Sequence, residues 1–243
     1  MTVFFIGTSP RDAYMLPDGA NIMLNARQFW NGMGWARHGR TSRGGLTFLD
    51  CGGYVFFNEH GYFPFTAAAY LNLVAYLKPD YYASMDYPCE PSISSALSGM
   101  DVMARIRATV ENCQLLADME CMTGGSLVPV IQGWQVEDYQ FCLDLYLSAG
   151  LIRPYMAVGS MCTRSNTAEI ADLVIGVHAA ATRAGVKQLH FFGLKRSDYL
   201  RPVQYLIHSQ DSAAVYYAPT AEIKRTWGGK KISTRQSGKA REH

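Results

Sequence analysis

The chain lacks the long hydrophobic runs and paired cysteines of membrane proteins and of disulfide-rich secreted domains. No apolar stretch approaches the ~18 residues that a membrane span requires, and the apolar start of the chain is interrupted at Pro10. The six cysteines include no Cys-x-x-Cys pair, so reduced thiols are the expected state. We therefore expect a soluble, cytoplasmic protein that makes no use of a membrane.

The chain also lacks two common nucleotide-binding motifs. Neither G-x-G-x-x-G nor G-x-x-x-x-G-K-[ST] follows a segment that we expect to be a strand, which leaves a Rossmann site and a P-loop unsupported. We expect no cofactor and no metal. As an alternative, Cys51, Cys89 and Cys162 each follow an expected strand end and could share a metal ion.

Short apolar runs that end in polar or glycine residues recur through the sequence. Such runs are typical of strands buried on both faces of a parallel sheet. At 243 residues and 49% hydrophobic, the chain can bury one sizeable core. The predicted strands are Val3–Ile6, Ile22–Leu24, Leu46–Leu49, Tyr81–Met85, Leu127–Ile131, Tyr155–Val158, Gln188–Phe192 and Ala213–Tyr217.

Helical patterns lie between most of these strands. The clearest are Phe65 to Leu77, Leu97 to Leu116, a segment that ends at Gly150, and a segment that begins at Asn166. Alternation of strands and helices predicts an α/β fold, a single (β/α)8 TIM-type barrel over residues 1–220. A doubly wound open sheet is the alternative.

Positive charge is concentrated at the end of the chain. Residues 221–243 hold seven basic and two acidic residues, a net charge of +5, which leaves −3 on residues 1–220 of a chain whose total is +2. Few apolar residues accompany this charge, so we predict a flexible basic tail in which Lys230 and Lys231 can contact phosphate. A merely solvated C-terminus is the alternative.

A second candidate for phosphate contact is the glycine-rich segment from Trp30 to Gly45. A guanidinium group can bind two phosphate oxygens at once, and this segment carries three guanidinium groups. The candidate residues are Arg37, Arg40 and Arg43. A solvated loop with no ligand is the alternative.

Three acids stand at the ends or starts of predicted strands, namely Asp50, Asp86 and Asp211. In a barrel, the carboxyl ends of the strands meet at one face, so these side chains should gather there. Paired carboxylates cleave and remake glycosidic bonds, because one attacks C1′ or stabilises an oxocarbenium-like centre while the other moves the proton of the leaving group. For any one of them, a cap or turn role is the alternative.

The same strand ends could hold a flat heterocycle. Such a ligand needs two aromatic faces, which Tyr54 and Phe192 can provide, and hydrogen bonds at its edge, which Asp86 and Gln132 can provide. Neighbouring glycines would let the backbone approach the ligand closely. The alternative is that both aromatic side chains belong to the core.

A series of motifs between residues 46 and 217 resembles, in order and spacing, the tRNA-guanine transglycosylases and their DNA-directed relatives in phage and bacterial DNA modification. The first part of the series resembles the Asp-Ser-Gly-Gly-Phe/Tyr and Val-Gln-Gly motifs of that family, and the second part its Leu-Ala-Val-Gly strand and its nucleophile. The matching segments are Asp50-Cys51-Gly52-Gly53-Tyr54, Asp86, Ile131-Gln132-Gly133, Met156-Ala157-Val158-Gly159, Phe192-Gly193 and Asp211-Ser212-Ala213.

The resemblance implies a (β/α)8 barrel that exchanges guanine in a polynucleotide for a 7-deazaguanine base. It implies that Asp211 is the nucleophile and that Asp50 is the general acid and base. It further implies a base pocket, whose residues would be Tyr54, Asp86, Gln132, Gly133, Met156, Phe192 and Gly193.

Departures from the family pattern indicate which branch the chain resembles. The tRNA enzymes carry a zinc site of three cysteines and a histidine after the nucleophile, whereas no cysteine follows Cys162 here. Trp134, Tyr155 and Ser160 also replace usual pocket residues, so the family's base preference does not transfer. With a short basic tail in place of the zinc subdomain, the chain is more similar to the compact DNA-modifying branch.

The expected function is therefore that of a glycosyltransferase (pentosyltransferase) that inserts a 7-deazaguanine base such as preQ0 into DNA in place of guanine. If the gene is a phage gene, the host cytoplasm is the expected location. Alternatives are a tRNA-guanine transglycosylase, a retaining glycosidase or nucleosidase that uses the same acids, and a non-enzymatic barrel that binds nucleic acid.

Overall fold

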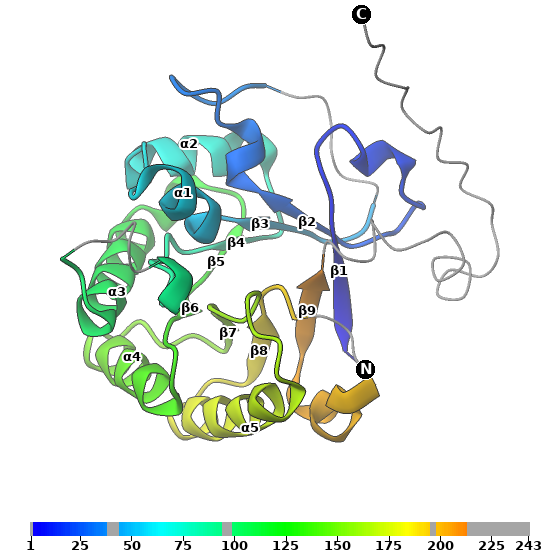
Figure 1. Cartoon of the computed structure of the whole chain (residues 1–243). Helices are drawn as coiled ribbons and strands as arrows, with labels where there is room; N and C mark the ends of the chain where they lie inside the picture. Colours follow the sequence, from blue (N-terminus) through cyan, green and yellow to red (C-terminus); the bar gives the residue numbers. More distant parts are fainter. Residues whose placement is uncertain (1, 38–43, 94–98, 195–197, 213–243) are drawn as a thin grey trace, which may run out of the picture.

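The computed structural model describes residues 2–37, 44–93, 99–194 and 198–212, which form a nearly closed barrel of parallel strands with helices around it (Figure 1). Neighbouring strands follow the order β5-β4-β3-β2-β1-β9-β8-β7-β6. The predicted TIM-type barrel is confirmed, and the open sheet is wrong. The strands are β1 (Val3–Gly7), β2 (Ile22–Asn25), β3 (Thr47–Asp50), β4 (Tyr81–Ala83), β5 (Ser126–Val128), β6 (Val130–Ile131), β7 (Tyr155–Val158), β8 (Gln188–Phe191) and β9 (Ser209–Ser212).

Pro129 divides the predicted strand Leu127–Ile131 into β5 and β6. A proline has no N–H to donate to a sheet ladder, so the strand pairing is interrupted there. β5 pairs with β4, and β6 pairs with β7. The hydroxyl of Ser84 accepts the N–H of Val130 at 2.9 Å, which replaces a missing ladder bond. The two short strands therefore act as one strand at which the barrel closes.

Five α-helices surround the described part of the barrel. Short 3₁₀ helices stand after β1 and β2 where a regular barrel would have α-helices, and one helix directly after β3 is absent from the sequence prediction. The predicted cap at Asn166 is confirmed, since its side chain accepts the N–H of Ala168. The helices are α1 (Gly53–His60), α2 (Ala67–Leu77), α3 (Val102–Asp118), α4 (Val136–Ser148) and α5 (Thr167–Arg183), and the 3₁₀ helices are Ala13–Met15, Ala26–Phe29, Pro91–Ile93, Glu120–Met122 and Asp198–Leu206.

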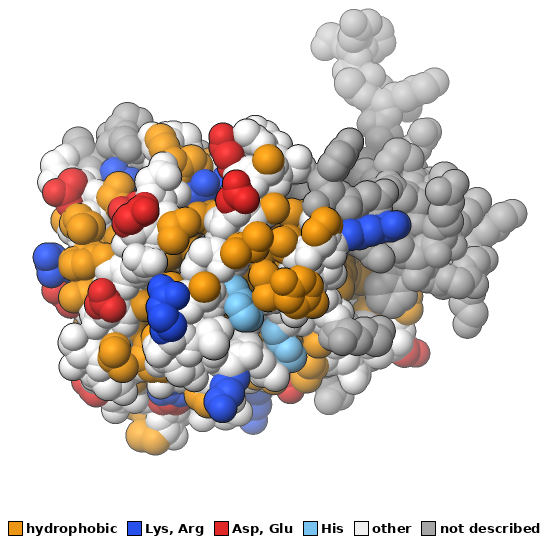
Figure 2. Space-filling view, turned by 90° about the horizontal axis from the view of Figure 1, so that it is seen from below, with side chains coloured by type: hydrophobic (Ala, Val, Ile, Leu, Met, Phe, Trp, Pro, Cys, Tyr) orange, Lys and Arg blue, Asp and Glu red, His pale blue; other side chains and the backbone are white. Residues whose placement is uncertain are grey.

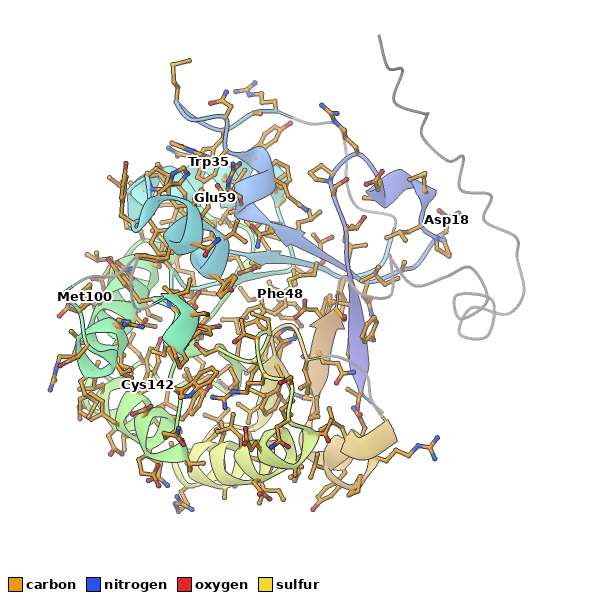
Figure 3. The ribbon with its side chains drawn as sticks, in the orientation of Figure 1. Asp18, Trp35, Phe48, Glu59, Met100 and Cys142 are labelled. Atoms are coloured by element: carbon orange, nitrogen blue, oxygen red, sulfur yellow. The ribbon has the colours of Figure 1, made fainter. Side chains whose placement is uncertain are left out.

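The barrel interior is filled by side chains from alternate positions of the strands. Phe48 lies near its centre (Figure 3), with the ring of Phe5 at 5.7 Å and that of His190 at 4.9 Å. The remaining members of the interior cluster are small, aliphatic or aromatic side chains of the other strands. Because side chains alternate along a strand, the residues two positions beyond this layer also face inward. Those positions form the site described below.

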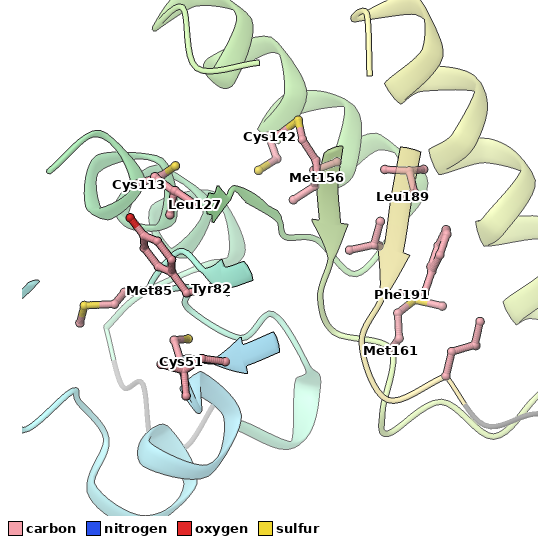
Figure 4. Packing of buried hydrophobic residues seen from close by; sticks show 14 of the residues in the cluster. Cys51, Tyr82, Met85, Cys113, Leu127, Cys142, Met156, Met161, Leu189 and Phe191 are labelled. Carbon is pink, nitrogen blue, oxygen red and sulfur yellow. The ribbon is translucent and has the colours of Figure 1, made fainter. Parts of the chain in front are cut away.

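A second, larger hydrophobic layer separates the strands from the helices. It contains the outward-facing side chains of the strands together with the inner faces of α2 to α5. Met156 of β7 and Cys142 of α4 are both fully buried in this layer, and Figure 4 shows them among its packed side chains. This layer carries most of the apolar burial and holds the barrel in place.

The last described strand lies earlier in the sequence than predicted. The chain pairs Ser209–Ser212 with β1 and β8, whereas the predicted strand Ala213–Tyr217 lies outside the described residues, as does the predicted tail 221–243. Asp211 is therefore a strand residue and does not precede a strand. The segment Ser209–Ser212 has no apolar run, which is why the sequence pattern missed it.

The side of the barrel covered by α5 and the helix Asp198–Leu206 is shown in Figure 2. Apolar side chains lie there beside two histidine side chains, with basic and acidic groups around them. Ile175 and Tyr205 are among the exposed apolar residues. No helix in the described part of the chain is long and apolar enough to cross a bilayer.

Candidate active site

Four inward-facing side chains lie two residues beyond the interior layer of the barrel. Asn25 and Asp50 end the paired strands β2 and β3, where they stand opposite one another in register. Asp211 lies two residues after Ser209 in β9, and Phe192 comes directly after β8. Since all of these strands are parallel, the four residues lie at the same, carboxyl end of the barrel. The strand register thus gathers Asp50 and Asp211 at one mouth, as predicted.

Asp50 is held in an environment that favours its neutral form. Its Oδ2 accepts the side-chain amide of Asn25 at 2.5 Å and its Oδ1 accepts the N–H of Gly52 at 3.0 Å, and these two hydrogen bonds favour the charged form but are outweighed. Burial, followed by the charge on Asp86 and a smaller contribution from Asp211, raises the pKa of Asp50 from 3.8 to about 7. A carboxyl group with this pKa can both give and accept a proton near neutral pH.

The two glycines after Asp50 allow the chain to turn directly into α1. Gly52 has a φ of +79°, which disfavours any other residue. A Cβ on Gly53 would lie 2.5 Å from the carbonyl oxygen of Asp86. The Gly-Gly pair therefore brings the start of α1 against the Asp86 backbone, and so fixes Asp50 beside Asp86.

Asp86 and Gln132 form a buried hydrogen-bonded pair. The Gln132 side-chain amide donates to Oδ2 of Asp86, and the Cys51 thiol donates to Oδ1 at 2.9 Å. Burial raises the pKa of Cys51, so the thiol keeps its proton and can donate it. Burial also raises the pKa of Asp86, and the hydrogen bonds from Cys51 and Gln132 oppose that effect. The two residues predicted to read a base edge are thus in contact.

The Gly193 backbone and the His190 ring both contact the same oxygen of Asp211. The Gly193 N–H donates to Oδ1 at 2.8 Å, and Nε2 of His190 lies 3.3 Å from Oδ1. A Cβ on Gly193 would lie 2.6 Å from Cβ of Cys162, so glycine is required for this approach. N–H donors stabilise a carboxylate in a low-dielectric site. Oδ1 is thereby held, while the Asp211 side chain stays 14% exposed at the mouth.

A chain of hydrogen bonds orients His190 toward Asp211. The Ser209 hydroxyl lies 3.0 Å from Nδ1 of His190 and 2.7 Å from the hydroxyl of Tyr155. If Tyr155 donates to Ser209 and Ser209 donates to Nδ1, then Nε2 carries the proton that faces Asp211. A neutral imidazole satisfies every contact in this chain. In this arrangement the successive donors are Tyr155 at the start of β7, Ser209 and His190, and Asp211 is the final acceptor.

The two aromatic residues of the predicted pocket lie in different hydrophobic clusters. Phe192 packs against Phe48 and His190 in the barrel interior, and Tyr54 packs from α1 against the cluster of Phe57 and Ile93. A stack of both rings on one ligand stays a prediction.

Two predicted pocket residues have a clear packing role. A Cβ on Gly133 would lie 2.8 Å from Cβ of Asp138, so this glycine admits the first turn of α4. Met156 is fully buried between the barrel and the helices, so the part it can offer to a ligand is its backbone. The alternation of β7 points this side chain outward, and only the strand's backbone remains for a ligand.

Only one of the predicted phosphate-binding residues lies in the described part of the chain. The Arg37 guanidinium lies 5.6 Å from the ring centre of Tyr76 on α2. Trp35, two residues earlier, donates its indole N–H to the carbonyl of Ala69 at 2.6 Å. This end of the glycine-rich segment is therefore anchored on α2. The other predicted residues, Arg40, Arg43, Lys230 and Lys231, lie outside the described residues.

One group of side chains in the described residues has the spacing of metal ligands. Ligand atoms of Asp50, Cys51 and Asp86 lie within 4.8 Å of one another. Each already has a protein hydrogen-bond partner, and the raised pKa of the Cys51 thiol, caused by burial, disfavours the thiolate that binds metals. The group does not include Cys89 or Cys162, the other two cysteines of the suggested metal site.

The sequence reasoning missed several residues that support the predicted ones. Asn25 contacts Asp50 and His190 contacts Asp211, and although Ser160 was expected at a pocket position, its contact with Gln132 was not predicted. Asn25 and His190 were both inside or at the end of predicted strands, where their inward register could have been counted. Ser160 has a φ of +54°, a left-handed conformation that no pattern in the sequence predicts.

Comparison with protein families agrees with this geometry. The family model of DpdA, deoxypurine in DNA protein A, matches residues 36–226, a span that includes every carboxylate, amide and histidine of the site except Asn25. The chain belongs to the DpdA family. A comparison with curated proteins gave no match.

Membership in the DpdA family identifies the broad role of the protein. DpdA proteins act in 7-deazaguanine modification of DNA and are transglycosylases related to the tRNA-guanine transglycosylases. The resemblance drawn from the motifs is therefore confirmed, and so is the choice of its DNA-modifying branch. The residues of the site have to be assigned from the geometry.

Proposed function

We propose that this DpdA protein replaces guanine in DNA with a 7-deazaguanine base such as preQ0, through a covalent intermediate on Asp211. An Asp211 oxygen attacks C1′, and the glycosidic bond breaks as its electron pair passes to the departing guanine. Asp50 supplies the proton that this base needs. Asp50 then removes a proton from the incoming base, whose nitrogen attacks C1′ and displaces Asp211.

The observation that carries the proposal is that Asp50 and Asp211, at the same end of the barrel, have different surroundings. The pKa of Asp50 is raised to about 7 by burial, whereas Oδ1 of Asp211 accepts an N–H from Gly193 and lies beside that of His190. Different environments for two neighbouring acids are typical of acid/base and nucleophile pairs. Asp50 can thus give a proton near neutral pH, and N–H donors hold Asp211 at the position from which its attack is proposed.

Base recognition is the second part of the proposal. Asp86 can accept N–H groups from the edge of a 7-deazaguanine, and the Gln132 amide can bind the same edge. Both are almost completely buried, and polar groups left unpaired in such a pocket discriminate strongly against a wrong base. Phe192, which packs against Phe48 and His190, is the proposed aromatic face.

An exchange assay tests the proposal. The protein is incubated with labelled guanine or a labelled 7-deazaguanine, and with either DNA or tRNA. We expect label to enter DNA with no net loss of bases. Base loss without exchange would support a nucleosidase, in which water resolves the intermediate. Transfer into tRNA alone would return the chain to the tRNA enzymes, and binding without chemistry would support a non-enzymatic barrel.

His190 should act as a positioning residue for Asp211. Replacing it with Phe should lower kcat for exchange by roughly 10- to 100-fold with little change in the KM for the base, because a hydrogen bond to a charged group is worth about 1.5–3 kcal/mol. Phe suits the aromatic surroundings, since the Phe192 ring lies 4.6 Å away. His190→Gln, which can still donate an N–H, should recover part of the loss, and His178→Phe on α5 is the matched control. An unchanged kcat in His190→Phe would remove the residue from this role.

The basic tail should govern attraction to DNA and leave the chemistry intact. Removing residues 224–243 deletes all seven basic residues of the tail, so DNA binding should weaken about equally for all sequences. The slope of log affinity against log salt should flatten by roughly 0.9 for each phosphate of duplex DNA that the tail no longer neutralises. Exchange at saturating DNA should survive. An unchanged salt slope in the truncated protein would show that the tail does not touch DNA.

A further inference from the structure

A fourth buried carboxyl group, Glu90, adjoins the site but takes no part in the steps above. It is 1% exposed, and the ion pairs in the described part of the chain do not include it. Its Oε2 lies 2.8 Å from the Ser160 hydroxyl, and the Cys162 thiol lies 3.8 Å from its Oε1. A charged carboxylate in such a place would be costly to bury.

The hydroxyl of Ser160 connects Glu90 to Gln132. Its oxygen lies 2.6 Å from Oε1 of Gln132, 2.8 Å from Oε2 of Glu90 and 2.9 Å from the backbone N–H of Cys89. The Cys89 N–H can only donate to this oxygen. A hydroxyl has a single proton, so it can donate to Gln132 or to Glu90 but not to both.

The number of protons available to these hydrogen bonds determines whether Glu90 is protonated. With Nε2 of Gln132 on Asp86 and Oε1 on Ser160, the hydroxyl donates to Gln132, and Glu90 must donate to the hydroxyl. Glu90 is therefore protonated in this arrangement, and both oxygens of Asp86 are acceptors. If the Gln132 amide were reversed, Ser160 would donate to Glu90 and the proton would have to sit on Asp86. In either arrangement the chain of four side chains holds one carboxyl proton.

We propose that Glu90 is the positioning residue of the base pocket, because it keeps that single proton and so leaves Asp86 free as an anionic acceptor beside a correctly oriented Gln132. Burial also raises the pKa of Glu90, in agreement with the proton count. The groups that face Glu90 are Ser160, the thiols of Cys89 and Cys162, and the more distant Asp86. Two guanidinium groups also lie in this region, where Arg105 donates to the Pro88 carbonyl and Arg164 to the Ser160 carbonyl, and the ion pairs of the described residues join neither of them to Glu90.

The backbone around Gln132 leaves the amide little freedom besides this reversal. A Cβ on Gly159 would lie 2.2 Å from Nε2 of Gln132, so the amide lies directly on the backbone at the end of β7. A base that presents two N–H donors to Asp86 needs the anionic form, whereas protonated Asp86 would offer a donor at the same place. The position of one proton thereby selects which base edge can bind, a conclusion that rests on the proposed function.

Infrared spectroscopy tests the proton itself without any substrate. The difference spectrum between wild type and Glu90→Gln at neutral pH should contain the carbonyl stretch of a neutral carboxylic acid, assigned to Glu90. The control, Glu137→Gln on the exposed start of α4, should show only a carboxylate signal. A carboxylate signal for Glu90, or loss of the neutral-acid band in Asp86→Asn alone, would overturn the inference.

Exchange kinetics test the role in base recognition. Glu90→Ala should raise the KM for the incoming base about tenfold with a smaller change in kcat, since a buried hydrogen bond is removed. Ser160→Gly removes the bridging hydroxyl, suits the φ of +54°, and should raise KM similarly. Glu90→Gln keeps a neutral donor and should restore KM to within a few-fold of wild type.

The outcomes separate the two proposals. Equal loss of base affinity in Glu90→Gln and Glu90→Ala would show that the charge of Glu90 is needed, and would overturn the inference while exchange itself stands. Wild-type protein without exchange would overturn the proposed function, yet the infrared result would still decide where the proton lies.

Discussion

Asp211→Asn should abolish base exchange while the protein keeps its fold. An amide is a far poorer nucleophile than a carboxylate of nearly the same size, and loss of a covalent nucleophile lowers kcat by roughly 10⁴-fold or more. Asn can keep its Oδ1 on the N–H groups of Gly193 and His190, so the mouth should stay in place. Wild type should form an adduct with DNA that resists denaturation, and the variant should form none.

Asp144→Asn is the matched control for this substitution, because the same change is made on the exposed face of α4, outside the proposed machinery. Both variants should unfold at temperatures close to that of wild type. Substantial exchange by Asp211→Asn, or an adduct that still forms in it, would remove Asp211 from the nucleophile role. The proposal also expects carboxyl groups of Asp50 and Asp211 roughly 5–8 Å apart, by analogy with paired-acid glycosyl chemistry, which a complex with DNA would measure.

Asp50→Asn should have the second largest effect and should change the pH profile. Loss of a general acid and base lowers kcat by roughly 10²- to 10⁴-fold. In wild type, the pKa of Asp50, raised to about 7 by burial, means that its acid form is present below pH 7 and is lost above it. The kcat/KM for release of guanine should therefore fall as pH rises through about 7, and the variant should lack that limb.

Binding separates this role from base recognition. Asp50→Asn should still bind the free 7-deazaguanine nearly as well as wild type does, because the edge contacts are assigned to Asp86 and Gln132. Calorimetric titration of the base measures this directly. A wild-type profile with no limb near pH 7, or a variant that loses base affinity and rate together, would contradict the assignment of Asp50 as acid and base.

The strands that the sequence predicted well are those with apolar runs on both faces. Tyr155–Val158 has the predicted bounds, because every one of its residues packs in either the interior or the outer layer. β9 was missed for the opposite reason. Its inward residues Ser209 and Asp211 are polar, and they are accommodated because His190 on the adjacent strand β8 contacts both of them.

The supporting residues of the site could not be predicted, since their partners are distant in the sequence. A histidine in an apolar strand, such as His190, looks the same whether it packs in a core or binds a carboxylate. Its carboxylate partner lies 21 residues away, and Glu90 and Ser160 are 70 residues apart. Only the closed barrel brings such pairs together. The motifs indicated the acids and the amide. The position of the proton shared by Glu90, Ser160 and Gln132 depends on contacts that only the folded chain makes.

The location of Asp211 on β9 links assembly of the protein to its activity. β9 lies between β1, at the start of the chain, and β8, so it completes the ring only after every other strand has been synthesised. Contacts between such distant segments form late and slowly in folding. If Asp211 is the nucleophile, as proposed, a chain that has not yet placed β9 lacks the group that attacks the nucleotide. Cleavage of the glycosidic bond would then depend on the final strand being in place.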